Sequence, residues 1–287
     1  MKKLLMIFVN FAKAIRDAGF SYIGSVNSSA KMLHSQEESH QYTYIVYLAP
    51  AKQSGYQVCT HSTKECRMGC LATSGHAGMD IASGKLIIQN CRIKKTRLLF
   101  EQQDFFMAWM IAEIKRAMAK AKKDGFYFSI RLNGTSDIDW ANIRYQGLNI
   151  FEIFPETNFY DYTKNANKFL NKPANYHLTY SYTGRNWEEC KALLEAGNNV
   201  AVVFNVKNES DLPDTFNGYK VINGDLTDYR IDDAKGIIVG LKWKRIADKE
   251  AEKYVKNSCF VVLPENTGCK NAEGKNILVG DILPMSN

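Results

Sequence analysis

Short runs of β-branched and aromatic residues alternate with helical patterns along most of this 287-residue chain. Several of these runs are apolar at successive positions, which is typical of strands covered on both faces of a parallel sheet. Helices that join such strands make right-handed crossovers. The pattern predicts an α/β fold, either a doubly wound layer or a partial or closed (β/α) barrel. We expect strands at Tyr44–Ala49, Phe126–Leu132, Asn158–Tyr162, His177–Tyr182, Asn199–Phe204, Gly218–Ile222 and Gly236–Leu241.

The segment between the first two expected strands contains the strongest helical pattern. Its apolar side chains recur at three- and four-residue spacing, so we expect them to face the sheet as part of the core. They are Phe106, Met107, Met110, Ile111, Ile114 and Met118, and the side chains expected on the opposite face are Glu113, Lys115, Arg116 and Lys120. A second helix is predicted from Trp187 to Ala196, with Gly197 as its stop signal.

The chain shows no linker, low-complexity segment or internal repeat, which favours one domain over residues 1–287. We expect an N-terminal helix over 1–20. Two lysines precede an apolar run there, as in a signal peptide, but charged residues interrupt the run and no small-residue cleavage site follows. No stretch reaches the roughly 18 apolar residues of a membrane span. We therefore expect a cytoplasmic protein without a membrane partner.

Three of the seven cysteines lie within twelve residues, in a cysteine-rich loop at 55–80. These are Cys59, Cys66 and Cys70, with six and then three intervening residues. Three thiolates at the carboxyl end of a strand can hold three irons of a [4Fe–4S] cluster and leave the fourth iron open. The alternatives are zinc, completed by His61 or His76, and cysteines without a metal.

The other four cysteines carry less information. An odd number, unevenly spread in a chain large enough to build its own core, argues against a secreted disulfide framework. Cys91 and Cys190 are predicted to be small core residues. Whether Cys259 and Cys269 form a second metal site stays open at this stage.

Polar residues follow several of the expected strands, at the edge of a parallel sheet where ligands bind. After the second strand comes a turn containing Asn133, Gly134, Ser136 and Asp137, which can accept hydrogen bonds from an ammonium group. The alternative is an ordinary turn in which Asp137 or Asp139 caps a helix. Later strands end near Tyr162 and Lys164, Ser181, Asn205, and Asn223.

The formal charge of +7 and the pI near 8.9 favour contact with anions, including nucleic acid. A zinc-containing or metal-free nucleic-acid-binding protein is therefore an alternative function, with aromatic residues for base stacking. The cations that support it are Arg92, Lys94, Lys95, Arg97, Lys115, Arg116, Lys120, Lys122, Lys123, Lys242, Lys244 and Arg245.

The order of features, a first strand, a three-cysteine loop and a second strand ending in a polar acidic turn, resembles the radical S-adenosylmethionine (SAM) enzymes. Their usual cysteine spacing is three and then two residues, and their turn usually ends Gly-Gly-Glu. The resemblance implies a [4Fe–4S] cluster on Cys59, Cys66 and Cys70, SAM cleavage, and an electron donor such as flavodoxin or ferredoxin. It places Asn133, Gly134, Ser136 and Asp137 near the methionine amino group, and Ser181, Asn205 and Asn223 near the ribose, carboxylate or adenine.

The chain also resembles the phage gene product 88 domain family, through the stretches 66–78, 131–137, 159–164, 179–184 and 224–244. This implies a phage or prophage accessory protein in the cytoplasm of an infected or lysogenic host, but the family brings no settled reaction. A radical-SAM-like iron–sulfur enzyme is the leading interpretation. A cluster protein without SAM chemistry is a further alternative.

Overall fold

A ten-stranded sheet organises the computed structural model, which describes residues 13–15, 17–26, 30–263, 269–270 and 276–277. The strands lie in the order β1-β2-β3-β4-β5-β6-β9-β8-β7, and β10 pairs with β6. They are β1 Gly24–Val26, β2 Gln41–Val46, β3 Tyr127–Arg131, β4 Asn158–Thr163, β5 Tyr176–Ser181, β6 Asn199–Phe204, β7 Thr215–Phe216, β8 Tyr219–Asn223, β9 Ile238–Lys242 and β10 Val261–Val262. A separate antiparallel pair contains β11 Cys269–Lys270 and β12 Asn276–Ile277.

The strands from β2 to β6 follow chain order and are all parallel, with registers such as Tyr44 beside Ile130 and Tyr162 beside Thr179. This part of the sheet lacks the order reversal of a doubly wound layer. The α/β class is confirmed. The sheet is open, because β1 and β7 are its edges and each pairs antiparallel with a single neighbour. The closed form of the expected barrel is therefore wrong for the described residues.

Eight helices of the described chain connect or cover these strands. They are α2 Ala30–Ser39, α3 Lys64–Met68, α4 Gly75–Ala82, α5 Ile87–Glu101, α6 Gln103–Asp124, α7 Ile150–Ile153, α8 Trp187–Glu195 and α9 Lys249–Lys256. The helices predicted from the periodicity are α6 and α8. Most of the expected helix over 1–20 lies outside the described residues, although residues 13–15 and 17 are helical. Within the described ranges, no helix combines the length and apolar character of a membrane span.

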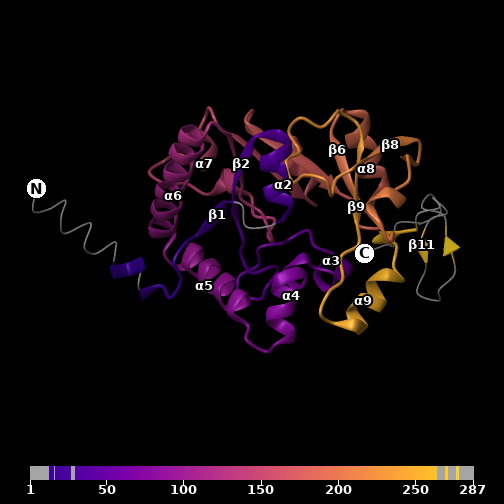
Figure 1. Ribbon diagram of the computed structural model, residues 1–287, viewed down its shortest axis with the longest axis horizontal. Helices are drawn as coiled ribbons and strands as arrows, with labels where there is room; N and C mark the ends of the chain where they lie inside the picture. Colours follow the sequence, from indigo (N-terminus) through magenta and orange to yellow (C-terminus); the bar gives the residue numbers. More distant parts are fainter. Residues whose placement is uncertain (1–12, 16, 27–29, 264–268, 271–275, 278–287) are drawn as a thin grey trace, which may run out of the picture.

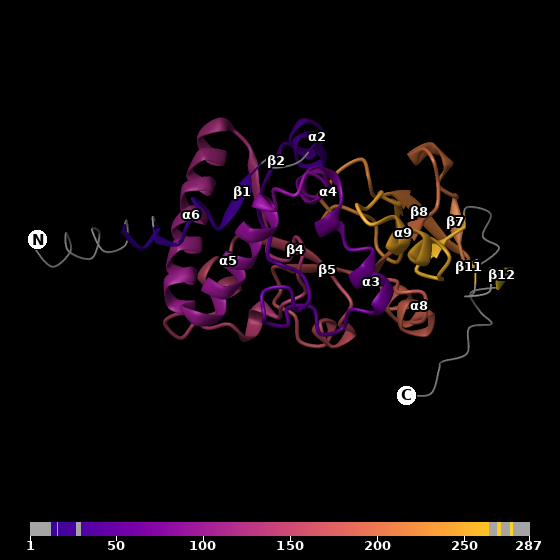
Figure 2. The same cartoon turned by 90° about the horizontal axis from the view of Figure 1, so that it is seen from below.

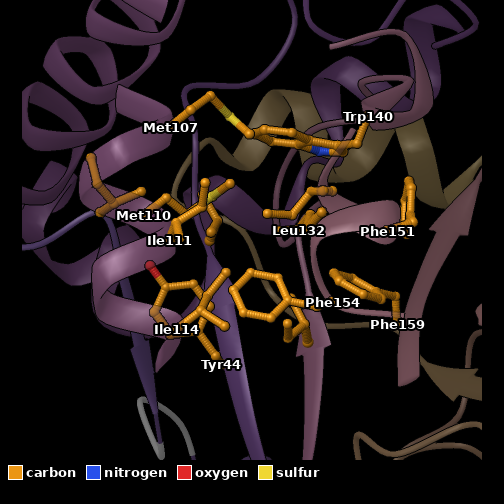
Figure 3. Packing of buried hydrophobic residues seen from close by; sticks show 14 of the residues in the cluster. Tyr44, Met107, Met110, Ile111, Ile114, Leu132, Trp140, Phe151, Phe154 and Phe159 are labelled. Atoms are coloured by element: carbon orange, nitrogen blue, oxygen red, sulfur yellow. The ribbon is translucent and has the colours of Figure 1, made fainter. Parts of the chain in front are cut away.

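The apolar stripe of α6 packs against the sheet, as its periodicity predicts. Met107, Met110 and Ile114 are fully buried and face side chains of β2–β4 and of the segments that follow them (Figure 3). The helix ends where Gly125 adopts a positive φ of 78° and its N–H bonds back to Ala121 and Lys122. Burying this stripe of large side chains, at about 25 cal/mol per Å² of apolar area, fixes α6 on the sheet.

The prediction for Glu113 is wrong. We expected its side chain on the solvent-facing side of α6, but it is buried. Its carboxylate accepts hydrogen bonds from the backbone N–H groups of Ile23 and Gly24 at 3.0–3.1 Å and from the Tyr44 hydroxyl at 2.7 Å. A buried carboxylate is tolerated when donors surround it, and these donors come from Ile23, from the first residue of β1 and from β2.

The two ends of the molecule carry different elements (Figures 1 and 2). Helix α6 stands at one end beside β1 and β2, whereas α8, β8 and α9 lie at the other end. Helix α9 packs against α3, and the Tyr254 hydroxyl donates to the buried Glu65 carboxylate at 3.4 Å. Helix α9 therefore supports the cysteine-rich loop, which was predicted at 55–80.

Candidate functional site

The turn after β3 is built around the buried side chain of Asn133. Its Oδ1 accepts from the Ser136 hydroxyl at 2.9 Å, the Ile138 N–H at 3.0 Å and the Trp140 indole at 3.1 Å. Its backbone N–H donates to Asp161 at 2.8 Å. Asn133 and Ser136 were predicted to contact a ligand, and here their polar groups hold the turn together.

Gly134 brings this turn against the end of β2. Its N–H donates to Val46 at 3.0 Å, and a Cβ atom at this position would lie 2.7–2.9 Å from the Tyr47 ring and the Val46 carbonyl. The position requires the absence of a side chain because real Cβ contacts are longer than 3.0 Å. Close packing against Tyr47 and Val46 is therefore enough to explain a glycine at position 134, without the predicted ligand.

Asp137 joins the β3 turn to the end of β4. One carboxylate oxygen accepts from the Thr163 hydroxyl at 2.8 Å and from Lys168 Nζ at 2.6 Å, and the other accepts from the Lys164 N–H at 2.9 Å. The side chain of Lys168 is 4% exposed, so this is a buried ion pair. The Asp137 N–H also donates to Val58 at 2.8 Å. Asp137 thus fixes the position at which the cysteine loop begins.

The three clustered cysteines lie at this same edge of the sheet. Cys59 follows Val58, and its sulfur lies 4.0 Å from the Thr135 carbonyl of the β3 turn. Cys66 lies in α3, whose N-cap Thr63 accepts the Cys66 N–H at 3.2 Å. Cys70 follows the C-cap of α3, Gly69. The loop was expected after the first strand, and these contacts place Cys59 beside the turn after β3 as well.

Nitrogen groups lie beside the three sulfurs. The Ala51 N–H donates to the Cys59 sulfur at 3.4 Å. The Ala72 N–H opposes the rise in pKa that burial causes at Cys70, and Cys66 raises the pKa of Lys164 against the effect of burial. N–H donors to sulfur stabilise thiolates and are one of the features that tune thiolate-bound metal centres.

The three sulfurs are close enough to influence one another electrostatically. Burial raises the pKa of the Cys70 thiol to about 11, and the neighbouring Cys66 and Cys59 raise it as well. Burial also raises the pKa of Cys59, with contributions from Cys66 and Asp137. Burial lowers the pKa of Lys164, but Cys66 and Asp137 outweigh that effect and raise it overall. Lys164 therefore interacts with this group of sulfurs, and so does Arg92, whose guanidinium interacts with Cys70.

All three cysteines are free and partly buried. Within the described ranges, no group of three His, Cys, Asp or Glu side chains is already arranged to hold a metal ion. The donor set fits a thiolate-bound metal, because three unpaired sulfurs with N–H donors lie on one loop, but their side chains would have to turn toward a common point. His61 and His76, the expected zinc ligands, are both exposed, and His61 shares a hydrogen bond with Thr60 at 3.0 Å.

The remaining cysteines lie apart from this group. Cys190 is fully buried in the core between α8 and the sheet, as predicted, and Cys91 is partly buried on α5. Cys259 is disulfide-bonded, so it offers no thiolate to a second metal site. The side chain of Cys269 lies outside the described residues.

The other expected SAM-binding residues do not share one environment. Ser181 is buried at the end of β5. The Asn205 N–H donates to Val262 of β10 at 2.8 Å. Asn223 lies in a local network, where it accepts from the Asp225 N–H at 2.9 Å and donates to Glu209 at 3.3 Å. Contacts link the β3 turn to the cysteine loop. Asn223, in contrast, bonds to Asp225 and Glu209.

Several of the cations considered for nucleic-acid binding have other partners. Lys95 is buried and donates to the Ile23 carbonyl at 2.8 Å, and Arg92 donates to the Ala72 carbonyl at 3.0 Å. Lys242 is partly buried. The exposed members of that set are Lys94, Arg97, Lys115, Arg116, Lys120, Lys122, Lys123, Lys244 and Arg245.

Sequence reasoning missed the role of Lys168 in this site. Nothing in the local pattern distinguishes it from a solvent-facing lysine, and its partner Asp137 lies 31 residues earlier. Lys164 was noted as a strand-end residue, but its contact with Cys66 depends on how the loop folds back over β4. Only the recurrence of polar residues at strand ends signalled that these segments would meet.

Comparison with known proteins gives one match. A family model described as Gene product 88 matches residues 24–257, which include the sheet from β1 to β9 and the three clustered cysteines. Neither the curated proteins nor the solved structures contain a match to the chain.

Proposed function

This chain belongs to the phage gene product 88 family, and we propose that it holds an iron–sulfur cluster on Cys59, Cys66 and Cys70. The observation that carries the proposal is the environment of the three sulfurs. They lie on one loop, the Ala51 N–H donates to the Cys59 sulfur at 3.4 Å, and they are close enough that Cys66 and Cys59 add to the effect of burial in raising the pKa of Cys70. Neighbouring thiolates repel one another, so each thiol makes the ionisation of the others less favourable. A metal centre binds thiolates and removes this repulsion.

The exposed positions of the two histidines considered as a fourth ligand favour iron–sulfur over zinc. A structural zinc site is normally closed by four protein ligands. His61 and His76 are both exposed, and His61 shares a hydrogen bond with Thr60. Three cysteines suit a [4Fe–4S] cluster with one open iron.

The finer form of the proposal is a radical-SAM-like enzyme with a partly closed barrel. It is supported by the chain-order parallel strands β2–β6 and by a cysteine loop that follows the first parallel strand. When bound, a [4Fe–4S] cluster with an open iron supplies one-electron chemistry, which would include reductive cleavage of SAM. The chain's own part is to hold the loop in place through Asp137 and to direct the Lys164 ammonium at Cys66.

The metal proposal is tested by iron and sulfide analysis of protein purified without oxygen. Wild type and Cys91→Ala should each hold roughly four irons and four sulfides per chain, and Cys66→Ala should lose most of both. Cys91 is a matched control because it is also a partly buried free cysteine but lies on α5. Equal iron in Cys66→Ala and Cys91→Ala would contradict the proposal.

SAM chemistry needs its own assay. Reduced, reconstituted protein should convert SAM into 5′-deoxyadenosine, with flavodoxin, ferredoxin or dithionite as the electron donor. A cluster that forms normally but neither yields this product nor responds spectrally to SAM would leave the third interpretation, a cluster protein without SAM chemistry.

A second candidate function is nucleic-acid binding through α6. Lys115, Arg116, Lys122 and Lys123 are exposed, and none of them forms an ion pair with a described residue. Such binding should weaken steeply with salt. Changing these four residues to glutamine should abolish a gel shift of labelled single- or double-stranded DNA at low salt, and the absence of any shift by wild type would exclude this candidate.

A further inference from the structure

The face of the sheet opposite the α6 core is polar. Residues of neighbouring strands that share this face include Thr43, Ser129, Arg131, Tyr160 and Tyr162, since alternate residues of a strand point to the same side. The hydroxyls of Thr43 and Ser129 lie 3.0 Å apart, and the Tyr160 hydroxyl lies 3.2 Å from that of Thr43. These contacts form a buried polar layer within the sheet.

Helix α2 and the segment 224–233 after β8 cover this polar face, and they lie side by side (Figure 1). Asp228 of the segment is buried, and its two oxygens accept from Arg131 Nη1 at 2.8 and 3.0 Å and from the Tyr160 hydroxyl at 3.0 Å. Its N–H donates to Ser35 of α2 at 2.7 Å. Arg131 therefore already holds a carboxylate, supplied by the chain itself.

The same neighbourhood contains buried donors that are left without acceptors. Seven buried side-chain nitrogen and oxygen atoms of the described residues have no hydrogen-bond partner, and five of them belong to this cluster. They are Arg131 Nε, Tyr162 Oη, Arg230 Nε, Arg230 Nη1 and Asp233 Oδ2. Four of the five carry donor hydrogens. Buried donors that make no hydrogen bond are costly and rare.

These atoms are grouped around Tyr162. The Arg131 guanidinium lies 5.0 Å from the centre of the Tyr162 ring. The side chain of Arg230 is 4% exposed and is held by Thr227, to which Nη2 donates at 2.8 Å. Its Nη1 lies 3.1 Å from Asp233 Oδ2, in a pair without hydrogen-bond geometry. Arg131 Nε forms a looser ion pair with Asp161 at 4.0 Å. Arg230 Nε and the Tyr162 hydroxyl are therefore the buried donors of this cluster, among the described residues, for which neither a hydrogen bond nor an ion pair is found.

We infer that Arg131, Tyr162 and Arg230 form a binding site for a small molecule that bears an oxyanion, a carboxylate or a phosphate. Two guanidinium groups and a hydroxyl match the acceptors of such a group, and charge-assisted bonds of this kind are strong. Arg131 already binds one carboxylate, because it donates to Asp228, and the Asp228 side chain fills part of the site.

Access requires a movement of the cover, because the unpartnered atoms have almost no exposed surface. The segment 224–233 must shift far enough to withdraw Asp228, while Arg230 on the same segment stays beside Tyr162. Tyr162 lies two residues before Lys164, so the site is about 7 Å along β4 from the lysine that faces the cysteines. The inference does not depend on a cluster being bound there.

The test measures the melting temperature of the full-length protein without metal. Succinate and inorganic phosphate are compared with sodium chloride at the same ionic strength. At about ten times its Kd, a ligand of this site should raise the melting temperature of wild type by roughly 3 °C. The larger shift identifies the source of the oxyanion, carboxylate or phosphate.

Tyr162→Phe separates a ligand site from a structural defect. The variant loses an unpartnered hydroxyl, so its melting temperature without ligand should rise by about 2 °C, whereas the shift caused by the ligand should disappear. Tyr127→Phe is the matched control because Tyr127 is 71% exposed, and it should keep the full shift. Arg230→Gln should also lose the shift, which protects the test if Tyr162→Phe fails to fold.

Two results would overturn the inference. One is a wild type whose melting temperature responds to succinate and phosphate no more than to chloride. The other is a folded Tyr162→Phe or Arg230→Gln variant that keeps the full ligand-induced shift.

Discussion

The ion pair between Lys168 and Asp137 offers the sharpest stability prediction. Lys168 Nζ donates to the Asp137 carboxylate at 2.6 Å, to the Ile138 carbonyl at 2.9 Å and to the Asp137 carbonyl at 3.3 Å. The two side chains are 4% and 12% exposed, so solvent replaces little of what is lost. Lys168→Met leaves a nearly buried carboxylate without its cation, and breaking such a pair costs about 3–5 kcal/mol.

The assay is urea unfolding followed by circular dichroism, with the free energy of unfolding taken from the midpoint and slope. Lys191→Met is the control, because its pair with Glu195 spans 4.0 Å on the surface and should be worth less than about 1 kcal/mol. Asp137→Asn and the double variant complete a cycle, which should give a coupling energy of about 2 kcal/mol. If Lys168→Met lowers the free energy of unfolding by less than about 1 kcal/mol, the Lys168–Asp137 pair does not behave as a buried ion pair.

Three further predictions concern the residues around the cysteines. Burial raises the pKa of Asp161 to about 6, so the folded state binds this proton more tightly than the unfolded state does. The free energy of unfolding should therefore fall by about 3 kcal/mol as the pH rises from about 4 to 6. Urea unfolding of Asp161→Asn should not show that fall. Burial raises the pKa of the Cys70 thiol to about 11, and Lys164 opposes that rise slightly. Lys164→Met should therefore slow the alkylation of Cys70 at pH 8, by at most about twofold, as measured by mass spectrometry; an unchanged or faster rate would show that the ammonium does not act on this thiol. Gly134→Ala should lower the free energy of unfolding by about 1–3 kcal/mol, because its Cβ would meet the Val46 carbonyl at 2.8 Å, and an unchanged urea midpoint would contradict the close packing.

The elements that the sequence predicts well are those with a strong period. The seven expected strands all occur as strands, with ends shifted by a few residues, and α6 contains the stripe from Phe106 to Met118. The carboxyl-end position of the cysteine loop follows from parallel strands alone. Short elements such as β1, β7 and β10 are two or three residues long and carry no period.

The contacts that sequence reasoning could not predict are pairings between distant charged residues. Arg131 and Asp228 are 97 residues apart, and Glu113 finds its donors 90 residues earlier in the chain. Each side chain alone has the pattern of a surface residue. Only the way in which β1, α2 and the segment after β8 pack on the sheet determines that these groups are buried together.

Metal and sulfide analysis of protein purified without oxygen, with an absorption spectrum, shows whether Cys59, Cys66 and Cys70 hold an iron–sulfur cluster. We expect roughly four irons and four sulfides per chain and a broad absorption band near about 400 nm that dithionite bleaches. One zinc per chain, or no metal in protein purified without oxygen, would contradict an iron–sulfur cluster.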